Sequence, residues 1–195
     1  NQPEDLNINQ ECVCTYPKTL QEAVRQQQAD LGVALDGDGD RLLMVDGTGK
    51  AYDGDQMLYI IAKHRKQQGT LKGGVVGTLM TNLGMQRGLE KIKVPFARAA
   101  VGDRYVLELM QNRGWQLGGE NSGHIICLDK HTTGDGIVSA LQVLHAMRAY
   151  RADMAHLTRE LALYPQVLVN VKVAKGFDFS NQRPVRDAPW IQVRW

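Results

Sequence analysis

The sequence predicts an α/β fold in which mixed, mainly parallel sheets are flanked by helices. Segments with the apolar spacing of helices alternate with short apolar runs along most of the 195 residues, and this alternation is typical of α/β units. Gly and Pro separate many of the segments, as turns require. Hydrophobic residues make up 43% of the chain, which is enough for a packed core and argues against wholesale disorder.

The first third of the chain predicts one helix and two strands. Residues 19–28 place Leu20, Ala23 and Val24 on one helical face, and Thr19 with Glu22 suits a capping box. The apolar run 31–35 predicts a buried strand, which ends where Asp and Gly begin to alternate. A second apolar run at 42–45 predicts another strand, and the turn signal Asp46-Gly47 follows it.

The rest of the chain predicts further elements in alternation. A Gly- and Val-rich run and a run with a proline near its start are among the expected strands, which cover residues 73–79, 94–101, 115–117, 125–128 and 166–173. The expected helices cover residues 54–67, 83–91, 103–112, 135–151 and 153–162. The longest of them spaces Ile137, Leu141, Leu144 and Met147 by three or four residues.

Composition excludes several classes of protein. The chain carries 23 basic and 21 acidic residues without a long run of like charge, so a nucleic-acid partner is not expected. No stretch approaches the roughly 20 apolar residues that span a bilayer, and the N-terminus lacks the features of a signal peptide. The three cysteines, Cys12, Cys14 and Cys127, are too few and too oddly spaced for a disulfide framework. We therefore expect reduced thiols, no membrane association and a cytoplasmic location.

An acidic loop is the first candidate site. Asp36, Asp38 and Asp40 alternate with glycines, and three carboxylates this close repel one another unless a hard divalent cation such as Mg²⁺ or Ca²⁺ joins them. An EF-hand needs Gly at its sixth position and Glu at its twelfth, where this loop has Arg41 and Gly47. A solvated acidic turn is the structural alternative.

Arg41 ends the acidic loop. Beside a metal, its guanidinium suits a phosphate oxygen or a sugar hydroxyl. The alternative is a salt bridge to a neighbouring aspartate.

A second loop, residues 118–124, lies between two predicted strands. Glu120 can accept two hydrogen bonds from vicinal hydroxyls, and Ser122 can donate or accept one. His124 titrates near neutrality, so it can move a proton or bind phosphate. The loop predicts sugar recognition, and a Gly-rich hairpin with a structural histidine is equally compatible with the residues alone.

Together the two loops resemble the α-D-phosphohexomutase superfamily. Asp36-Gly37-Asp38-Gly39-Asp40-Arg41 is similar to its metal-binding loop, and Gly119-Glu120-Asn121-Ser122-Gly123-His124 is similar to its sugar-binding loop. Two further stretches resemble the phosphoglucosamine mutase branch: Val101-Gly102-Asp103-Arg104-Tyr105-Val106 and Thr132-Thr133-Gly134-Asp135-Gly136-Ile137. The resemblance runs from about residue 6 to about residue 173 and implies phosphohexomutase-type α/β domains.

The resemblance also implies a chemistry. Such an enzyme interconverts glucosamine 6-phosphate and glucosamine 1-phosphate, on the route to UDP-N-acetylglucosamine, through a phosphoserine donor and a bisphosphate intermediate. Mg²⁺ would be held by Asp36, Asp38 and Asp40, the catalytic residues would be Arg41 and His124, and the sugar would be bound by Glu120 and Ser122. The expected partners are a hexosamine phosphate and, in the complete enzyme, a second copy in a homodimer.

Asp103 and Arg104 stand where mannose and glucose members of the superfamily usually place a histidine at the first position. A carboxylate near the sugar favours an ammonium at carbon 2, so we assign both residues to substrate binding. The alternative for Asp103 is a cap of the helix that starts there.

The resemblance is that of an internal segment. No Thr-Ala-Ser-His-Asn-like serine loop and no Arg-x-Ser-Gly-Thr-Glu-Pro-like phosphate loop occurs in the 195 residues. We expect residues 1–52 to be the C-terminal part of domain 2, 53–164 to be domain 3 and 165–195 to be a linker with the start of domain 4. The isolated chain is therefore expected to be inactive. A phosphomannomutase or phosphoglucomutase fragment and a non-catalytic remnant that binds metal or sugar phosphate are the alternatives.

Overall fold

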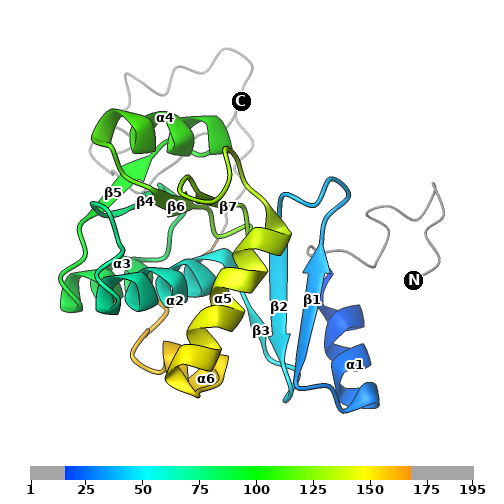
Figure 1. Ribbon diagram of the computed structural model, residues 1–195. Coiled ribbons are helices and arrows are strands. Elements are labelled where there is room, and N and C mark those ends of the chain that lie inside the picture. The colour runs from blue at the N-terminus through cyan, green and yellow to red at the C-terminus, as the bar shows by residue number, and fades with distance from the viewer. Residues whose placement is uncertain (1–15, 168–195) are drawn as a thin grey trace. The chain divides into compact units, whose positions relative to one another are not determined.

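The computed structural model describes residues 16–167 (Figure 1). Contacts divide the chain between Tyr164 and Pro165, and the elements below all belong to the first of the two parts. The predicted strand at 166–173 and the cysteines Cys12 and Cys14 fall wholly or mostly outside the described residues. Cys127 is buried and free.

Helix α1 (Pro17–Gln27) begins two residues earlier than predicted. Pro17 occupies the first helical position, where its fixed φ suits the helix and its missing N–H is not needed. Tyr16 is the N-cap and makes no side-chain cap, so the capping box predicted for Thr19 and Glu22 is wrong: Thr19 already lies inside the first turn. Val24 is buried against Gly32, where an added Cβ would lie 2.5 Å from the valine side chain.

The first sheet is antiparallel, with strand order β1-β2-β3. β1 is Leu31–Leu35, β2 is Leu42–Asp46 and β3 is Ala51–Tyr52. The expectation of a buried β1 is wrong, because only Gly32 is buried there and Val33 is 42% exposed. The acidic loop joins two antiparallel strands, although the alternation of elements predicted mainly parallel sheets. A loop this short can join antiparallel neighbours, whereas parallel strands need a crossover of about a dozen residues.

The second sheet is mixed, with strand order β5-β4-β6-β7 (Figure 1). β4 runs parallel to both β5 and β6, and β7 is antiparallel to β6. The four strands in this order are Phe96–Ala99, Val75–Thr78, Leu117–Gly119 and Ile125–Cys127. The carboxyl ends of β4, β5 and β6 therefore meet at one edge of the sheet, which is where α/β proteins place ligand loops.

Helices cover both faces of this sheet. Helix α4 (Asp103–Arg113) lies on one face, and α2 (Gly54–Gln67) with α3 (Leu83–Lys91) lies on the other (Figure 1). Buried Val106 and Met110 of α4 form a small cluster with the strands, and the larger core lies on the α2 side. The result is a three-layer α/β/α arrangement, which confirms the predicted α/β class.

Helix α5 (Gly136–Tyr150) joins the two sheets, because it packs against β2, β7 and α2 (Figure 1). Its buried side chains are small ones such as Ala140, Val143 and Ala146. The leucine and isoleucine spacing that predicted the helix does not mark its buried face, since Ile137 and Leu141 are 61% and 56% exposed.

The last helix among the described residues is α6 (Met154–Thr158), which is shorter than predicted. Every helix within residues 16–167 is too short or too polar to cross a lipid bilayer.

Candidate functional site

The acidic loop closes the β1–β2 hairpin and gathers its carboxylates. One oxygen from each of Asp36, Asp38 and Asp40 lies within 4.8 Å of the others. Asp36 shapes the loop, because its Oδ1 accepts a hydrogen bond from the Arg41 N–H at 3.0 Å and its carbonyl accepts one from Gly39 N–H at 3.2 Å. The loop therefore offers three carboxylates to one point, as the sequence predicted.

The electrostatics of this loop favour a bound cation. Burial raises the pKa of the Asp40 carboxyl, and the neighbouring Asp36 raises it further. Asp40 Oδ1 is buried and has no partner among the described residues, although buried polar atoms are normally paired. A hard divalent ion supplies both the missing partner and the missing positive charge, so the residues present fit Mg²⁺.

The loop between β6 and β7 lies directly beside the acidic loop. The Leu42 N–H donates to the Gly123 carbonyl at 3.2 Å, and Arg41 pairs with His124 as an isolated antiparallel bridge. Gly123 has a φ of 96°, and an added Cβ would run into the Leu42 carbonyl oxygen. Only glycine allows this close approach. The two loops that the sequence singled out thus share one location.

The side chain of His124 faces the acidic loop. Its side chain is 4% exposed, and Nε2 lies 3.4 Å from Asp40 Oδ2. Nδ1 is buried without a partner among the described residues. The imidazole is directed at a candidate metal ligand and not at open solvent, which favours an orienting role over direct contact with a substrate.

Glu120 links the second loop to a third one. The residue is 9% exposed, and its Oε1 accepts a hydrogen bond from the Gly102 N–H at 3.0 Å. Gly102 follows β5 and has a φ of 128° as the N-cap of α4. The loops after β5 and β6 are therefore tied together at the edge of the sheet, and Glu120 keeps its second oxygen for another donor.

Ser122, Asp103 and Arg104 are exposed near this link. Asp103 is the first residue of α4 and not its cap, since the N-cap is Gly102. The capping alternative is therefore wrong. The Arg104 guanidinium lies 5.5 Å from the centre of the Tyr105 ring.

Arg41 makes the salt bridge that was the alternative to a ligand contact. Its Nε lies 3.8 Å from Asp36 Oδ2, and its side chain is 46% exposed. An exposed ion pair of this length contributes little free energy, so the guanidinium can exchange this partner for an anion at small cost.

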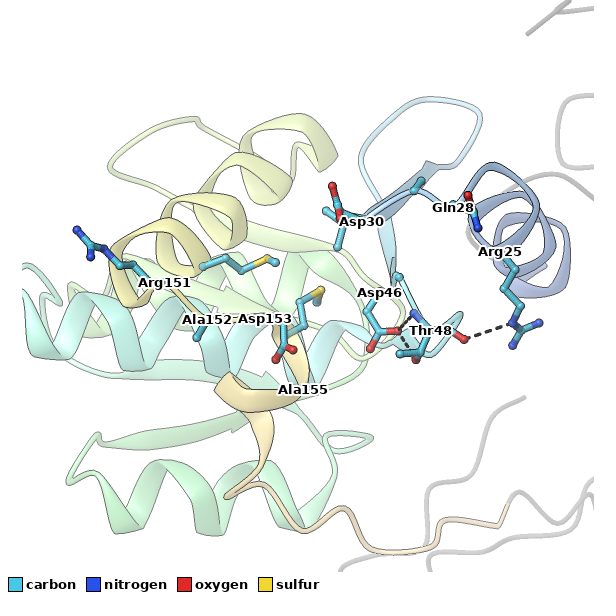
Figure 2. Close-up of a pocket in the computed structure, with 14 residues that line it drawn as sticks. Arg25, Gln28, Asp30, Asp46, Thr48, Arg151, Ala152, Asp153 and Ala155 are labelled. Atoms are coloured by element: carbon cyan, nitrogen blue, oxygen red, sulfur yellow. Dashed lines mark hydrogen bonds between the residues drawn. The ribbon is translucent and has the colours of Figure 1, made fainter.

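A pocket of about 790 Å³ lies at the opposite end of the hairpin (Figure 2). It is lined by residues from the end of α1, the start of β1, the end of β2 and the α5–α6 junction. Its buried carboxylate, Asp46, accepts hydrogen bonds from Thr48 and Tyr52. Figure 2 shows the Asp46–Thr48 pair on the pocket wall. The pocket contains none of the predicted site residues and no unpaired buried group, so it is not the site.

Glycines around the site were missed by reasoning about side chains. An added Cβ at Gly134 would collide with the His124 ring, and one at Gly136 would lie 2.9 Å from the Arg41 carbonyl oxygen. Both belong to the Thr132–Ile137 stretch, from which only a family resemblance was inferred. The spacing of two glycines around Asp135 was the available signal.

Comparisons with known proteins identify the relatives of this chain. Residues 53–164 match the family model described as phosphoglucomutase/phosphomannomutase, alpha/beta/alpha domain III. The phosphoglucosamine mutase of Nitrosospira multiformis is 64% identical over 186 residues, which is 95% of this chain and 40% of that protein. The chain thus spans about two fifths of the length of the curated relatives it matches.

Solved structures share the fold. A putative phosphomannomutase from Thermus thermophilus superposes with a TM-score of 0.71 at 24% identity, over 80% of this chain and 36% of that one. The N-acetylphosphoglucosamine mutase of Aspergillus fumigatus, in complex with GlcNAc-6P and magnesium, superposes with a TM-score of 0.66 at 22% identity, over 87% of this chain and 44% of that one. At such identities the likeness concerns the fold alone. Because the family model covers more than half of the sequence, this chain belongs to the phosphoglucomutase/phosphomannomutase family.

Proposed function

We propose that the protein to which this chain belongs is a phosphoglucosamine mutase, which interconverts glucosamine 6-phosphate and glucosamine 1-phosphate through a bisphosphate intermediate. The contact between Asp40 and His124 carries the proposal, because it joins a candidate cation loop and a candidate sugar loop in one place. The names of relatives that are 56–64% identical support the choice of substrate.

The proposed cofactor is Mg²⁺, held by Asp36, Asp38 and Asp40. When bound, the ion supplies Lewis-acid stabilisation of charge on a transferring phosphoryl group. The protein's own part is positional, since phosphoryl transfer depends on alignment and charge neutralisation more than on covalent help. Asp36 arranges the loop through its hydrogen bond to Arg41, and the exposed Arg41 guanidinium is placed to bind a phosphate oxygen.

The proposed sugar contacts come from the second loop. Glu120 Oε1 is occupied by the Gly102 N–H, so its Oε2 would accept from a sugar hydroxyl, with the exposed Ser122 hydroxyl beside it. Because the Gly102 link fixes the carboxylate before any ligand arrives, little side-chain freedom is lost on binding. A proton-transfer role for His124 stays a prediction.

Asp103 and Arg104 are the proposed discriminating residues. Their loop is tied to Glu120 through Gly102, so the acidic side chain at 103 follows directly after the residue that donates to the proposed sugar-binding carboxylate. We expect Asp103→His to lower kcat/KM for glucosamine phosphates relative to glucose phosphates. An unchanged ratio of kcat/KM for the two substrates would contradict a role of Asp103 in discrimination.

The domain assignment is part of the proposal. Residues 1–52 would be the C-terminal part of domain 2, 53–164 domain 3, and 165–195 a linker with the start of domain 4. The 195-residue chain alone would then lack turnover. A cytoplasmic location and a homodimeric complete enzyme accompany this proposal.

The test uses the complete open reading frame that encodes this chain. The purified product, assayed with Mg²⁺, is expected to convert glucosamine 6-phosphate with a higher kcat/KM than mannose or glucose phosphates. The reverse preference would favour a phosphomannomutase or phosphoglucomutase. Binding without turnover on any hexose phosphate would favour a non-catalytic module.

A further inference from the structure

The start of helix α5, far from the acidic loop in sequence, contacts the backbone of that loop. The Gly136 N–H, at the first position of α5, donates to the Gly39 carbonyl at 2.8 Å. An added Cβ at Gly136 would lie 2.9 Å from the Arg41 carbonyl and 3.0 Å from the Gly39 carbonyl. The backbone of the acidic loop thus rests on the backbone at the start of α5.

The same segment also sets the position of His124. An added Cβ at Gly134 would lie 2.6 Å from Cε1 and 2.7 Å from Cδ2 of the imidazole, so the ring occupies the space that a side chain would fill. Gly134 is itself fixed by a bridge to Ile126 in β7. The ring atom nearest to this added Cβ is Nε2, which also faces Asp40, and the side chain is only 4% exposed, so the ring has little room to move.

The two carboxylate oxygens of Asp40 show which group this support positions. Asp40 presents one carboxylate oxygen to His124 Nε2 at 3.4 Å, and its other oxygen is buried without a partner among residues 16–167. An arrangement in which the protein orients one oxygen and leaves the second unmet is that of a metal ligand with an outer partner. Such partners fix the orientation of ligands and strengthen metal binding.

We propose that Gly134 and Gly136 are positioning residues of the cation site: Gly134 holds the His124 ring beside Asp40, and Gly136 holds the backbone of Gly39. The inference rests on the proposed function, because it needs a cation among Asp36, Asp38 and Asp40. None of these supporting residues touches the cation; each acts through another group.

The alternative is that Gly134 is small only because the core is tight there. The two explanations differ in what must move. The atoms that an added methyl would meet are the outer end of one side chain and not backbone. Because these atoms belong to one side chain, an added methyl would displace the ring from its place beside Asp40 and leave the neighbouring backbone where it is. A positioning role predicts loss of metal affinity without matching loss of stability, and tight packing predicts the opposite.

The experiment measures Mn²⁺ affinity of the 195-residue chain from the electron paramagnetic resonance signal of the free ion, since Mn²⁺ accepts the same oxygen ligands as Mg²⁺. Gly134→Ala is expected to raise the dissociation constant about 10-fold, as loss of an outer partner does. Gly114→Ala is the control, because that glycine has a φ of 64° and open space around it at the end of α4. Gly114→Ala introduces backbone strain far from the acidic loop, so it should keep the wild-type affinity for Mn²⁺.

A double-mutant cycle with His124→Ala identifies the route of the effect. His124→Ala alone should weaken Mn²⁺ binding about 10-fold, and adding Gly134→Ala should then change little, because no ring remains to be displaced. If Gly134→Ala fails to fold, the His124→Ala measurement still tests the proposal, because that substitution only removes atoms.

Three results would overturn the inference: wild-type affinity in Gly134→Ala, wild-type affinity in His124→Ala, or an equal effect of Gly134→Ala in the presence and absence of His124. A wild-type chain that binds no Mn²⁺ would instead remove the cation site and with it the proposed function. The failure of the positioning role and the failure of the site are therefore distinguishable.

Discussion

Two aspartates at opposite ends of one hairpin have opposite environments. Asp46 ends β2 beside the pocket of Figure 2 and is 7% exposed. Its Oδ1 accepts from the Thr48 N–H and hydroxyl and from the Lys50 N–H at 2.6–3.1 Å, and its Oδ2 accepts from the Tyr52 hydroxyl at 2.8 Å. Asp40, at the other end, has a buried oxygen with no partner among the described residues.

The pKa values of the two carboxyls follow from these environments. Burial acts to raise the pKa of Asp46, but the hydrogen bonds from Thr48 and Tyr52 outweigh it and lower the value. Burial raises the pKa of Asp40, and Asp36 adds to the rise. The protein satisfies one carboxylate by itself and leaves the other to a partner from outside. This difference is what we expect if Asp46 is structural and Asp40 is a metal ligand, as proposed above.

Metal affinity should show the largest contrast. Asp40→Asn removes a proposed ligand, so the Mn²⁺ dissociation constant should rise about 100-fold, more than for the loss of an outer partner. Asp46→Asn, measured by the same titration, should leave it unchanged as long as the variant is folded. Equal Mn²⁺ affinities for the two variants would contradict the assignment of Asp40 as a ligand and Asp46 as a structural residue.

Asp55, a third aspartate and a fully buried one, sharpens the comparison. It has one oxygen bonded to the Asn82 N–H at 2.7 Å and the other unpaired among the described residues. Burial raises its pKa to about 7, so protonation can meet the need that a cation would meet at Asp40.

The sign of the pH effect follows from that raised pKa. The folded chain favours the protonated carboxyl, so the stabilisation is complete below about pH 4 and is lost as the pH rises through about 7. Between pH 5 and pH 8 the free energy of unfolding should fall by an amount on the order of 2 kcal/mol. In Asp55→Asn this dependence should be much weaker in urea denaturation at the two pH values. A parallel fall in both proteins would mean that Asp55 does not titrate in this range.

For stability without metal, we expect Asp46→Asn to have a larger effect than Asp40→Asn, which is the reverse of the order expected for metal affinity. Asp46→Asn disturbs a fully hydrogen-bonded buried carboxylate and should lower the free energy of unfolding by roughly 2 kcal/mol. Asp40→Asn removes a carboxyl group whose ionised form the fold disfavours, so the free energy of unfolding should rise slightly. Urea denaturation in the presence of a chelator measures both. Greater destabilisation by Asp40→Asn than by Asp46→Asn would contradict the assignment of roles.

The smallest effect concerns thermal stability. Mg²⁺ at about ten times its dissociation constant should add about 1.4 kcal/mol, which corresponds to roughly 3 °C in Tm for a chain of this size. Asp40→Asn should show no such rise, and Asp46→Asn should show the full rise from a lower starting point. Differential scanning fluorimetry with and without Mg²⁺ is sufficient. An equal rise in all three proteins would indicate non-specific ion effects.

Local signals in the sequence predicted the elements best where they agreed with the packing. Helix α2 has the predicted bounds; Asp53 and Gln56 form a capping box at its start, and buried residues fill most of its length. Helix α5 was found by its apolar spacing, but its buried face could not be read from that spacing. Small residues such as Ala140 and Ala146 make its close contacts, while Leu141 is exposed. Burial depends on which neighbour lies opposite, and periodicity does not contain that information.

The candidate site divides in the same way. The spacing of Asp36, Asp38 and Asp40 was sufficient to predict that their carboxylates gather, since all three belong to one short loop, and the cation itself stays a proposal. The role of Gly134 was not predictable, because a glycine acts through the space it leaves for a residue elsewhere in the chain, here His124. The antiparallel hairpin was missed for a related reason: the direction of a strand is set by its connection and not by its own residues.

Anomalous diffraction from a crystal of the chain soaked in Mn²⁺ tests the central claim most directly. We expect a peak within about 2.5 Å of carboxylate oxygens of Asp36, Asp38 and Asp40, and none beside Asp46. A peak at the Asp46 end of the hairpin, or an empty acidic loop at saturating Mn²⁺, would contradict the account.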